Sequence, residues 1–139
     1  MITVQPVPLN YVNQTWPLVE KYIASALEEG EIGEPMYNIH HIRGYLTSGA
    51  WLLLVAVDEN NDIHGAATVS FINNPLHRVA FITAIGGKLI ANKNTFEQLK
   101  IIVRQNGASI IQGYGRPSII RLWKRYNFEP RNTLVEALL

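Results

Sequence analysis

The sequence predicts one layered α/β domain, in which a mostly antiparallel mixed sheet of about six strands is flanked by four helices. Strand-like and helix-like apolar patterns alternate along the 139 residues, with no repeat, linker or low-complexity tract between them. Hydrophobic residues make up 47% of the chain and charged residues 17%, which is an ordinary globular composition. A chain of this length buries roughly two-thirds of its unfolded surface. Residues 1–139 are therefore expected to form a single domain.

The first third of the chain predicts an edge strand and two helices. Ile2–Val7 alternates loosely and stops at a proline, which keeps a strand near an edge of its sheet. Thr15 is expected to cap a helix that runs to Glu29, because apolar residues recur there at helical spacing and a glycine follows. Tyr37–Ser48 then predicts a second, shorter helix that also ends at a glycine.

The middle of the chain predicts three strands. Trp51–Val57 is a continuous apolar run typical of a buried strand, and a polar turn connects it to a strand over Ile63–Ile72. This pair is expected to form an antiparallel hairpin. A further β-rich run covers Arg78–Ile85, and the adjacent Gly86 and Gly87 are expected to interrupt it with a bend or bulge.

The last third predicts two helices and two strands. Thr95 is expected to cap a helix whose apolar residues recur every three to four positions. A short strand follows over Ala108–Gln112, and a glycine-rich turn leads into a helix that opens near Pro117. A final strand is expected over Thr133–Leu138.

Charge and composition exclude several classes of function. With 12 Lys and Arg against 11 Asp and Glu, the net charge of +1 gives no general attraction to nucleic acid or to an anionic membrane. The absence of cysteine excludes disulfides, thiolate zinc sites and a cysteine nucleophile. Because the N-terminus lacks a leader pattern and no apolar run is long enough to span a bilayer, we expect a cytoplasmic protein.

The histidines do not predict a metal site. His40 and His41 are adjacent on a predicted helix, so their side chains point in different directions, and no ligand follows at the matching spacing. His64 and His77 are isolated in the sequence. No bound metal is expected.

The last predicted helix carries the most specific pattern. Residues Arg116–Phe128 read RPSIIRLWKRYNF. They resemble the helix of the GNAT (N-acetyltransferase) superfamily that begins at an asparagine and ends in a tyrosine, polar residues and a Gly-Phe pair. Asn127 takes the place of that glycine, and asparagine also tolerates the left-handed conformation at a helix C-terminus. The predicted order of elements resembles the same superfamily over essentially the whole chain.

The resemblance implies an acyl-CoA-dependent N-acyltransferase with acetyl-CoA as its cofactor. Family members hold pantetheine along the fourth strand and pyrophosphate at a helix N-terminus, where backbone N–H groups approach the phosphates. The matching positions are Ala84, Ile85 and Gly86 for pantetheine, and Lys93, Asn94 and Thr95 for the phosphates.

Three positions depart from the family pattern. Asn94 and Phe96 stand where the phosphate loop has small residues, so the loop either cradles phosphate or only caps the helix. Trp123 stands where the family's general acid, a tyrosine, would lie, and an indole donates a hydrogen bond but cannot shuttle a proton. Tyr126 and Tyr114 are the remaining candidate phenolic acids, with packing against the sheet as the alternative role of Tyr126.

These departures leave two interpretations. In the first, the protein transfers an acyl group from coenzyme A to a primary amine by direct attack in a ternary complex. In the second, it is a non-catalytic GNAT-fold protein used in assembly, similar to phage-encoded proteins, and lies in the host cytoplasm or in the virion. Few residues follow Phe128, so the sheet is expected to keep an open edge that a second copy or a partner protein covers.

Overall fold

The structure, a computed structural model, describes residues 1–30, 35–89 and 92–139. Its elements in chain order are β1 (Thr3–Pro6), α1 (Val12–Gly30), α2 (Ile39–Thr47), β2 (Leu52–Val57), β3 (Ile63–Asn73), β4 (Arg78–Gly87), α3 (Lys93–Gln105), β5 (Ile110–Gly113) and α4 (Pro117–Trp123). Short 3-10 turns precede α1 and follow α4. None of the helices in these three ranges is long and apolar enough to cross a membrane.

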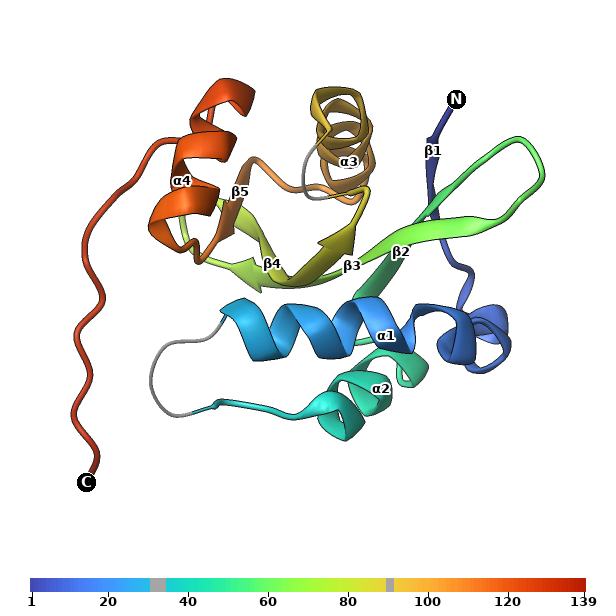
Figure 1. The fold of residues 1–139 in the computed structure, drawn as a ribbon. Coiled ribbons are helices and arrows are strands. Elements are labelled where there is room, and N and C mark those ends of the chain that lie inside the picture. The colour runs from blue at the N-terminus through green and yellow to red at the C-terminus, as the bar shows by residue number, and fades with distance from the viewer. Residues whose placement is uncertain (31–34, 90–91) are drawn as a thin grey trace.

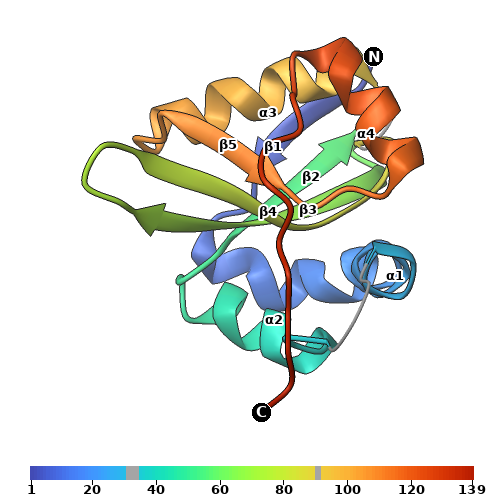
Figure 2. The ribbon, with the colours of Figure 1, turned by 90° about the vertical axis from the view of Figure 1, so that its left-hand side faces the viewer.

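The described strands form one five-stranded sheet in the order β1-β2-β3-β4-β5. The first three pairings are antiparallel and the last, between β4 and β5, is parallel. Helices α1 and α2 cover one face of the sheet, and α3 and α4 cover the other (Figures 1 and 2). The predicted layered α/β fold is therefore confirmed.

Strand β2 explains how one sheet supports two apolar layers. Successive side chains of a strand point to opposite faces, so an uninterrupted apolar run serves both faces. Leu54 and Ala56 join the cluster under α3 and α4, whereas Leu53 and Val55 join the cluster under α1 and α2. The apolar run of β2 is therefore buried on both faces of the sheet, as its composition predicts.

Three of the four helices begin elsewhere than the sequence predicts. Thr15 does not cap α1, which begins at Val12, because its hydroxyl donates back to the carbonyl of Tyr11 at 2.9 Å. Asn38 caps α2, and Asn92 rather than Thr95 caps α3, in each case by accepting backbone N–H bonds in the first turn. Asparagine favours this position because its side-chain oxygen reaches the unpaired N–H groups of a helix start.

The paired glycines do not interrupt β4, contrary to the prediction. Gly86 pairs with Ala66 and Gly87 pairs with Gly65, so β4 remains paired with β3 as far as its last residue, Gly87. A Cβ at Gly86 would lie 2.7 Å from the carbonyl oxygen of Tyr22, which shows that glycine here lets α1 approach the sheet. The irregularity lies instead near Thr83, between the pairs of Thr68 and Val69 with β4.

The predicted final strand over Thr133–Leu138 is also wrong for the single chain. Phe128 packs against Phe96 and Trp123, and Asn127 before it adopts the predicted left-handed conformation with φ 68°. Beyond Phe128 the chain leaves the edge of β5 and forms no strand. Without a neighbouring strand the segment has no ladder partner, which is the physical reason for the difference.

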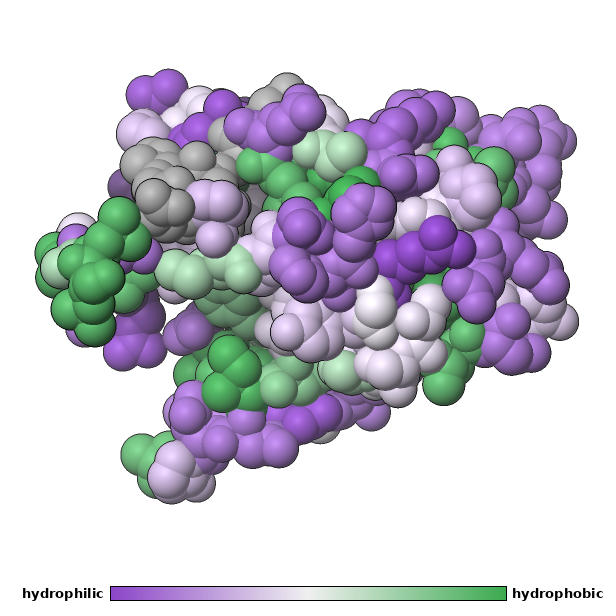
Figure 3. Space-filling model, turned by 90° about the horizontal axis from the view of Figure 1, so that it is seen from below, coloured by the Kyte–Doolittle hydropathy of each residue, from purple (hydrophilic) through white to green (hydrophobic). Residues whose placement is uncertain are grey.

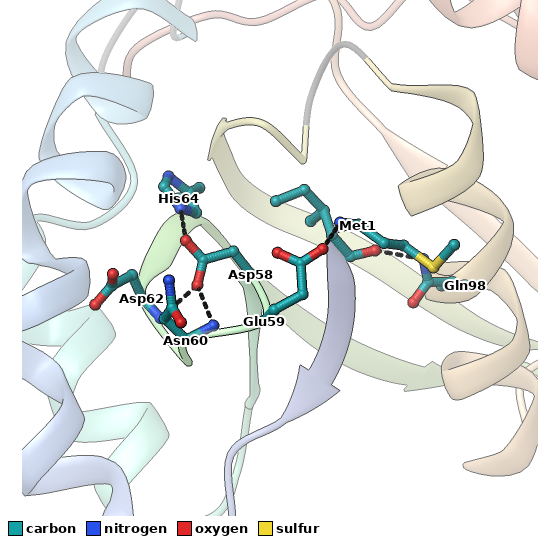
Figure 4. Close-up of polar contacts among 8 residues, drawn as sticks. Met1, Asp58, Glu59, Asn60, Asp62, His64 and Gln98 are labelled. Carbon is teal, nitrogen blue, oxygen red and sulfur yellow. Dashed lines mark hydrogen bonds and ion pairs between the residues drawn. The ribbon is translucent and has the colours of Figure 1, made fainter.

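The turn between β2 and β3 is held by a network of polar contacts (Figure 4). One oxygen of Asp58 accepts the N–H groups of Asn60 at 2.8 Å and Asp62 at 3.0 Å, and the other lies 2.7 Å from Nε2 of His64. Glu59 pairs with the N-terminal ammonium. These contacts fix the hairpin and attach the N-terminus to it.

Acid should weaken the fold through Asp58. Contact with His64 and the turn N–H groups lowers the pKa of Asp58 below its ordinary value of 3.8. A carboxylate with a depressed folded-state pKa stabilises the protein above its unfolded pKa, and this contribution is lost as pH falls through the folded value. As pH falls below about 4, the free energy of unfolding measured in urea should therefore decrease less for Asp58→Asn than for the unaltered protein. If the free energy of unfolding depended on pH equally in both proteins, the contribution assigned to Asp58 would be contradicted.

The cap of α3 gives a second prediction about stability. Asn92→Ala removes the acceptor for two backbone N–H groups, so the free energy of unfolding should fall by about 1 kcal/mol. Asn94→Ala is the matched control, because its exposed side chain caps nothing in the described part of the helix. Denaturant unfolding measures both, and equal losses in the two variants would overturn the assignment of the cap.

Candidate active site

The candidate site lies where β4 and β5 part. Val79–Ile82 of β4 pair with Ile110–Gly113 of β5. Beyond Ile82, β4 continues to Gly87, whereas beyond Gly113 the chain leaves the sheet. A cavity of about 280 Å³ opens beyond this point. The separation of the two parallel strands thus leaves a hollow beside the part of β4 that does not pair with β5.

The walls of the cavity are mainly aromatic and apolar. Five aromatic side chains contribute to the lining, namely Tyr37, Trp51, Phe81, Tyr114 and Trp123. Arg116 is the one charged residue among the described lining residues. Viewed from the side of α1 and α2, hydrophobic atoms lie in a recess toward the C-terminal segment, whereas hydrophilic atoms dominate the helix surfaces (Figure 3).

One wall is shaped by a bulge in β4 that the sequence pattern does not predict. The hydroxyl of Thr83 donates to the carbonyl of Thr68 at 2.9 Å, and the two hydroxyl oxygens lie 2.7 Å apart. The carbonyl of Thr83 accepts the hydroxyl of Tyr37 at 3.2 Å. Bulges commonly re-aim a strand next to a binding site. The sequence signal that could have indicated this place is the presence of Thr68 and Thr83 within otherwise apolar strand runs.

The structure brings two of the three predicted pantetheine positions to the cavity. Ala84 and Ile85 line it, and both are more than nine-tenths buried. Gly86 does not belong to the lining and packs instead against the backbone of Tyr22. The glycine is therefore explained by helix packing.

The predicted phosphate positions lie at the first turn of α3. Lys93 and Asn94 are exposed, whereas Thr95 is fully buried and donates its hydroxyl to the carbonyl of Asn92 at 2.9 Å. The side chain of Asn92 accepts the N–H groups of Asn94 and Thr95 at 2.8 and 3.3 Å. Two of the N–H groups expected to meet a phosphate thus already have a partner. Ala91, the residue before this cap, lies outside the described residues.

Phe96 points into the core and leaves the helix start unobstructed. It is fully buried, and the centroid of its ring lies 5.5 Å from that of Trp123 and 5.0 Å from that of Tyr126. Although Phe96 takes the place of a small residue in the family's phosphate loop, its side chain packs in the core.

The two candidate phenols occupy different environments. Tyr114 is 68% exposed, lines the cavity and forms a T-shaped ring contact with Phe81. Tyr126 is 5% exposed, packs against Phe96 and does not belong to the cavity lining. The geometry therefore favours the packing role for Tyr126 and leaves Tyr114 as the phenol within reach of the cavity.

Trp123 and Arg116 supply two buried donors without acceptors. Both residues line the cavity, and neither Nε1 of Trp123 nor Nε of Arg116 has a hydrogen-bond partner among the described residues. A buried donor left unsatisfied costs about 1–3 kcal/mol, so such groups usually bond an ordered water, an ion or a ligand. The indole fits because Gly113 lacks a side chain, since a Cβ there would lie 3.2 Å from Cζ3 of Trp123.

No protein-family model matches the sequence, and neither does any curated protein. Solved structures match it over nearly its whole length. A predicted acetyltransferase from Clostridium acetobutylicum, solved with acetyl-CoA, has a TM-score of 0.66 at 17% identity, covering 99% of this chain and 96% of that one.

Two further matches have the same fold at lower identity. An aminoglycoside acetyltransferase from an uncultured soil metagenomic sample, in complex with sisomicin, has a TM-score of 0.71 at 11% identity, with 99% and 95% of the chains covered. An acetyltransferase of Trypanosoma brucei has a TM-score of 0.64 at 11% identity and full coverage of both chains. The chain therefore has the fold of the GNAT acetyltransferases, as the order of its elements predicts.

Proposed function

We propose that the protein binds an acyl-CoA along β4 and transfers its acyl group to a primary amine. The observation that carries the proposal is the cavity at the parting of β4 and β5, with the bulge at Thr83 in its wall. Beyond Ile82, one edge of β4 has no described strand partner, so its backbone groups can bond the amides of a pantetheine arm. Acetyl-CoA bound to the structural neighbour from Clostridium acetobutylicum supports this choice of ligand.

The diphosphate of the ligand would meet the N-terminus of α3. Lys93 provides a charged ammonium there, and the helix end adds a partial positive charge. Because Asn92 already accepts two of the N–H groups, Lys93 carries a larger share of the phosphate contact than a lysine beside a free backbone cradle would.

The donors of the cavity define the chemistry of the transfer. The amine nitrogen attacks the thioester carbonyl, the new C–N bond forms, and the C–S bond breaks to release a thiolate that takes up the proton lost by the amine. Trp123 donates a hydrogen bond that stabilises the developing negative charge but keeps its proton. Tyr114 is the phenol at the cavity that can relay a proton. A slow enzyme is expected, because the described lining includes no carboxylate base.

The second candidate function is a non-catalytic one, in which the fold serves protein assembly. The capped start of α3 and the tryptophan at the position of the family's acid favour it. The two functions differ in one measurable property, because only the first requires acyl-CoA to bind. The phage, virion and cytoplasmic settings remain predictions from the sequence.

Calorimetric titration with acetyl-CoA tests the proposed cofactor site. We expect micromolar binding that Lys93→Ala weakens about tenfold, corresponding to about 1.4 kcal/mol. Lys21→Ala is the matched control, since it removes the same charge from an exposed position on α1, across the sheet from α3. Absence of binding by calorimetry and by thermal shift would exclude the enzymatic function and leave the assembly function.

Substitution of Trp123 tests the proposed chemistry. Trp123→Phe keeps an aromatic ring but removes the N–H donor, so the release of free thiol from acetyl-CoA with a panel of primary amines should slow by about ten- to a hundredfold. Trp123→Tyr introduces a phenol that can transfer a proton and should exceed the unaltered protein in rate. Equal rates for all three forms, with acetyl-CoA affinity unchanged, would remove Trp123 from the reaction.

A further inference from the structure

The C-terminal segment Thr133–Leu139 presents apolar side chains to water. Leu134, Val135 and Leu138 are 69%, 85% and 72% exposed. Figure 1 shows the segment leaving α4 and running along the outside of the molecule, and Figure 2 shows it continuing past the sheet to the level of α2. Within the described part of the chain, no hydrogen bond joins residues 129–139 to the rest of the protein.

Strand β5 has an unprotected edge. It pairs with β4 on one side, and no described strand lies on the other. An open edge presents unpaired N–H and C=O groups, which proteins usually cover, charge or shorten. The body of the protein thus lacks one strand at the edge where an apolar extended segment of the same chain begins.

A groove separates these two features. It has a volume of about 720 Å³ and lies between β5 and the beginning of the C-terminal segment. One wall contains Ile110–Gly113, and the opposite wall contains Asn127–Thr133. The residues after Thr133 do not line the groove but lead away from it. The segment therefore frames the space beside its own β5 without filling it.

We propose that Thr133–Leu138 of one copy enters this groove in a second copy and adds a strand to the edge of β5. The exchange is reciprocal, because each copy offers one free segment and one free edge. A two-fold dimer closes this arrangement, and each sheet then has six strands. A second copy is favoured over an unrelated partner because a single exchange satisfies both unpaired features of the same chain.

The side chains of the segment suit an inserted strand. Val135, Ala137 and Leu139 would share one face, while Leu134 and Leu138 would share the other with Glu136, the one charged residue of the segment. Apolar residues on both faces are appropriate, because helices cover both faces of this sheet. The predicted strand of the sequence analysis would then form between chains.

The buried area is sufficient for a stable dimer. At about 1.45 Å² per dalton, the six extended residues Thr133–Leu138 expose on the order of 900 Å². If about half of that area is covered, and a similar area of the groove with it, two exchanged segments bury roughly 1,800 Å², which lies in the range of stable interfaces.

Light scattering after size exclusion tests the proposal with the full chain. At about 100 μM the unaltered protein should have twice its chain mass of 15.7 kDa, and the chain truncated after Asn132 should have the single mass. The truncated chain should keep its circular dichroism spectrum, because residues 133–139 are exposed and form no hydrogen bond with the rest of the described chain. Its unfolding midpoint should fall below that of the unaltered protein, because dimerisation stabilises the folded chain by mass action. A monomeric unaltered protein, or a truncated chain that remains dimeric, would overturn the proposal.

Two additional measurements identify the contact. Leu134→Asp with Val135→Asp should shift the protein to monomer, whereas Leu76→Asp, at an 89% exposed position in the turn between β3 and β4, should leave the dimer intact. A synthetic peptide of residues 129–139 should bind the truncated chain, and a scrambled peptide should not. Equal effects of the two kinds of substitution, or no binding of the peptide by the folded truncated chain, would count against strand exchange.

Discussion

The pairing of β4 controls the rest of the structure. Along its whole length β4 is bonded to β3, which holds it between the two apolar layers, but β5 accompanies it only as far as Ile82. The remaining part of β4 is therefore bonded to a strand on one edge and has no described strand partner on the other. This single asymmetry produces the cavity, places the bulge at Thr83 beside it, and leaves α3 to begin after the strand ends.

The layered fold could be predicted because it depends on periodicity, which short stretches of sequence record directly. The apolar run over Trp51–Val57 and the helical spacing of the four helices all correspond to observed elements. Helix starts were less predictable, because Thr15, Asn92 and Thr95 are all chemically suited to capping. Only the three-dimensional course of the chain decides which of them meets unpaired N–H groups.

The candidate site was predictable only where side chains lie in a recognisable pattern. Ala84 and Ile85 follow from the position of the strand, and they do reach the cavity. The separation of Tyr114 from Tyr126, and the lack of acceptors for Trp123, depend on packing between distant elements. The prediction of a strand over Thr133–Leu138 failed for a related reason. An alternating apolar pattern indicates that a segment can form a strand, but it does not indicate which chain supplies the neighbouring strand.

The central claim is that a ligand with hydrogen-bond acceptors occupies the opening between β4 and β5. The most direct measurement is the nuclear magnetic resonance spectrum of the three indole N–H groups during titration with acetyl-CoA. The account predicts a large shift of the Trp123 signal together with the amides of Ala84 and Ile85, and little change at Trp16, which lies in the core under α1 and α2. Saturable shifts confined to other parts of the protein would contradict it.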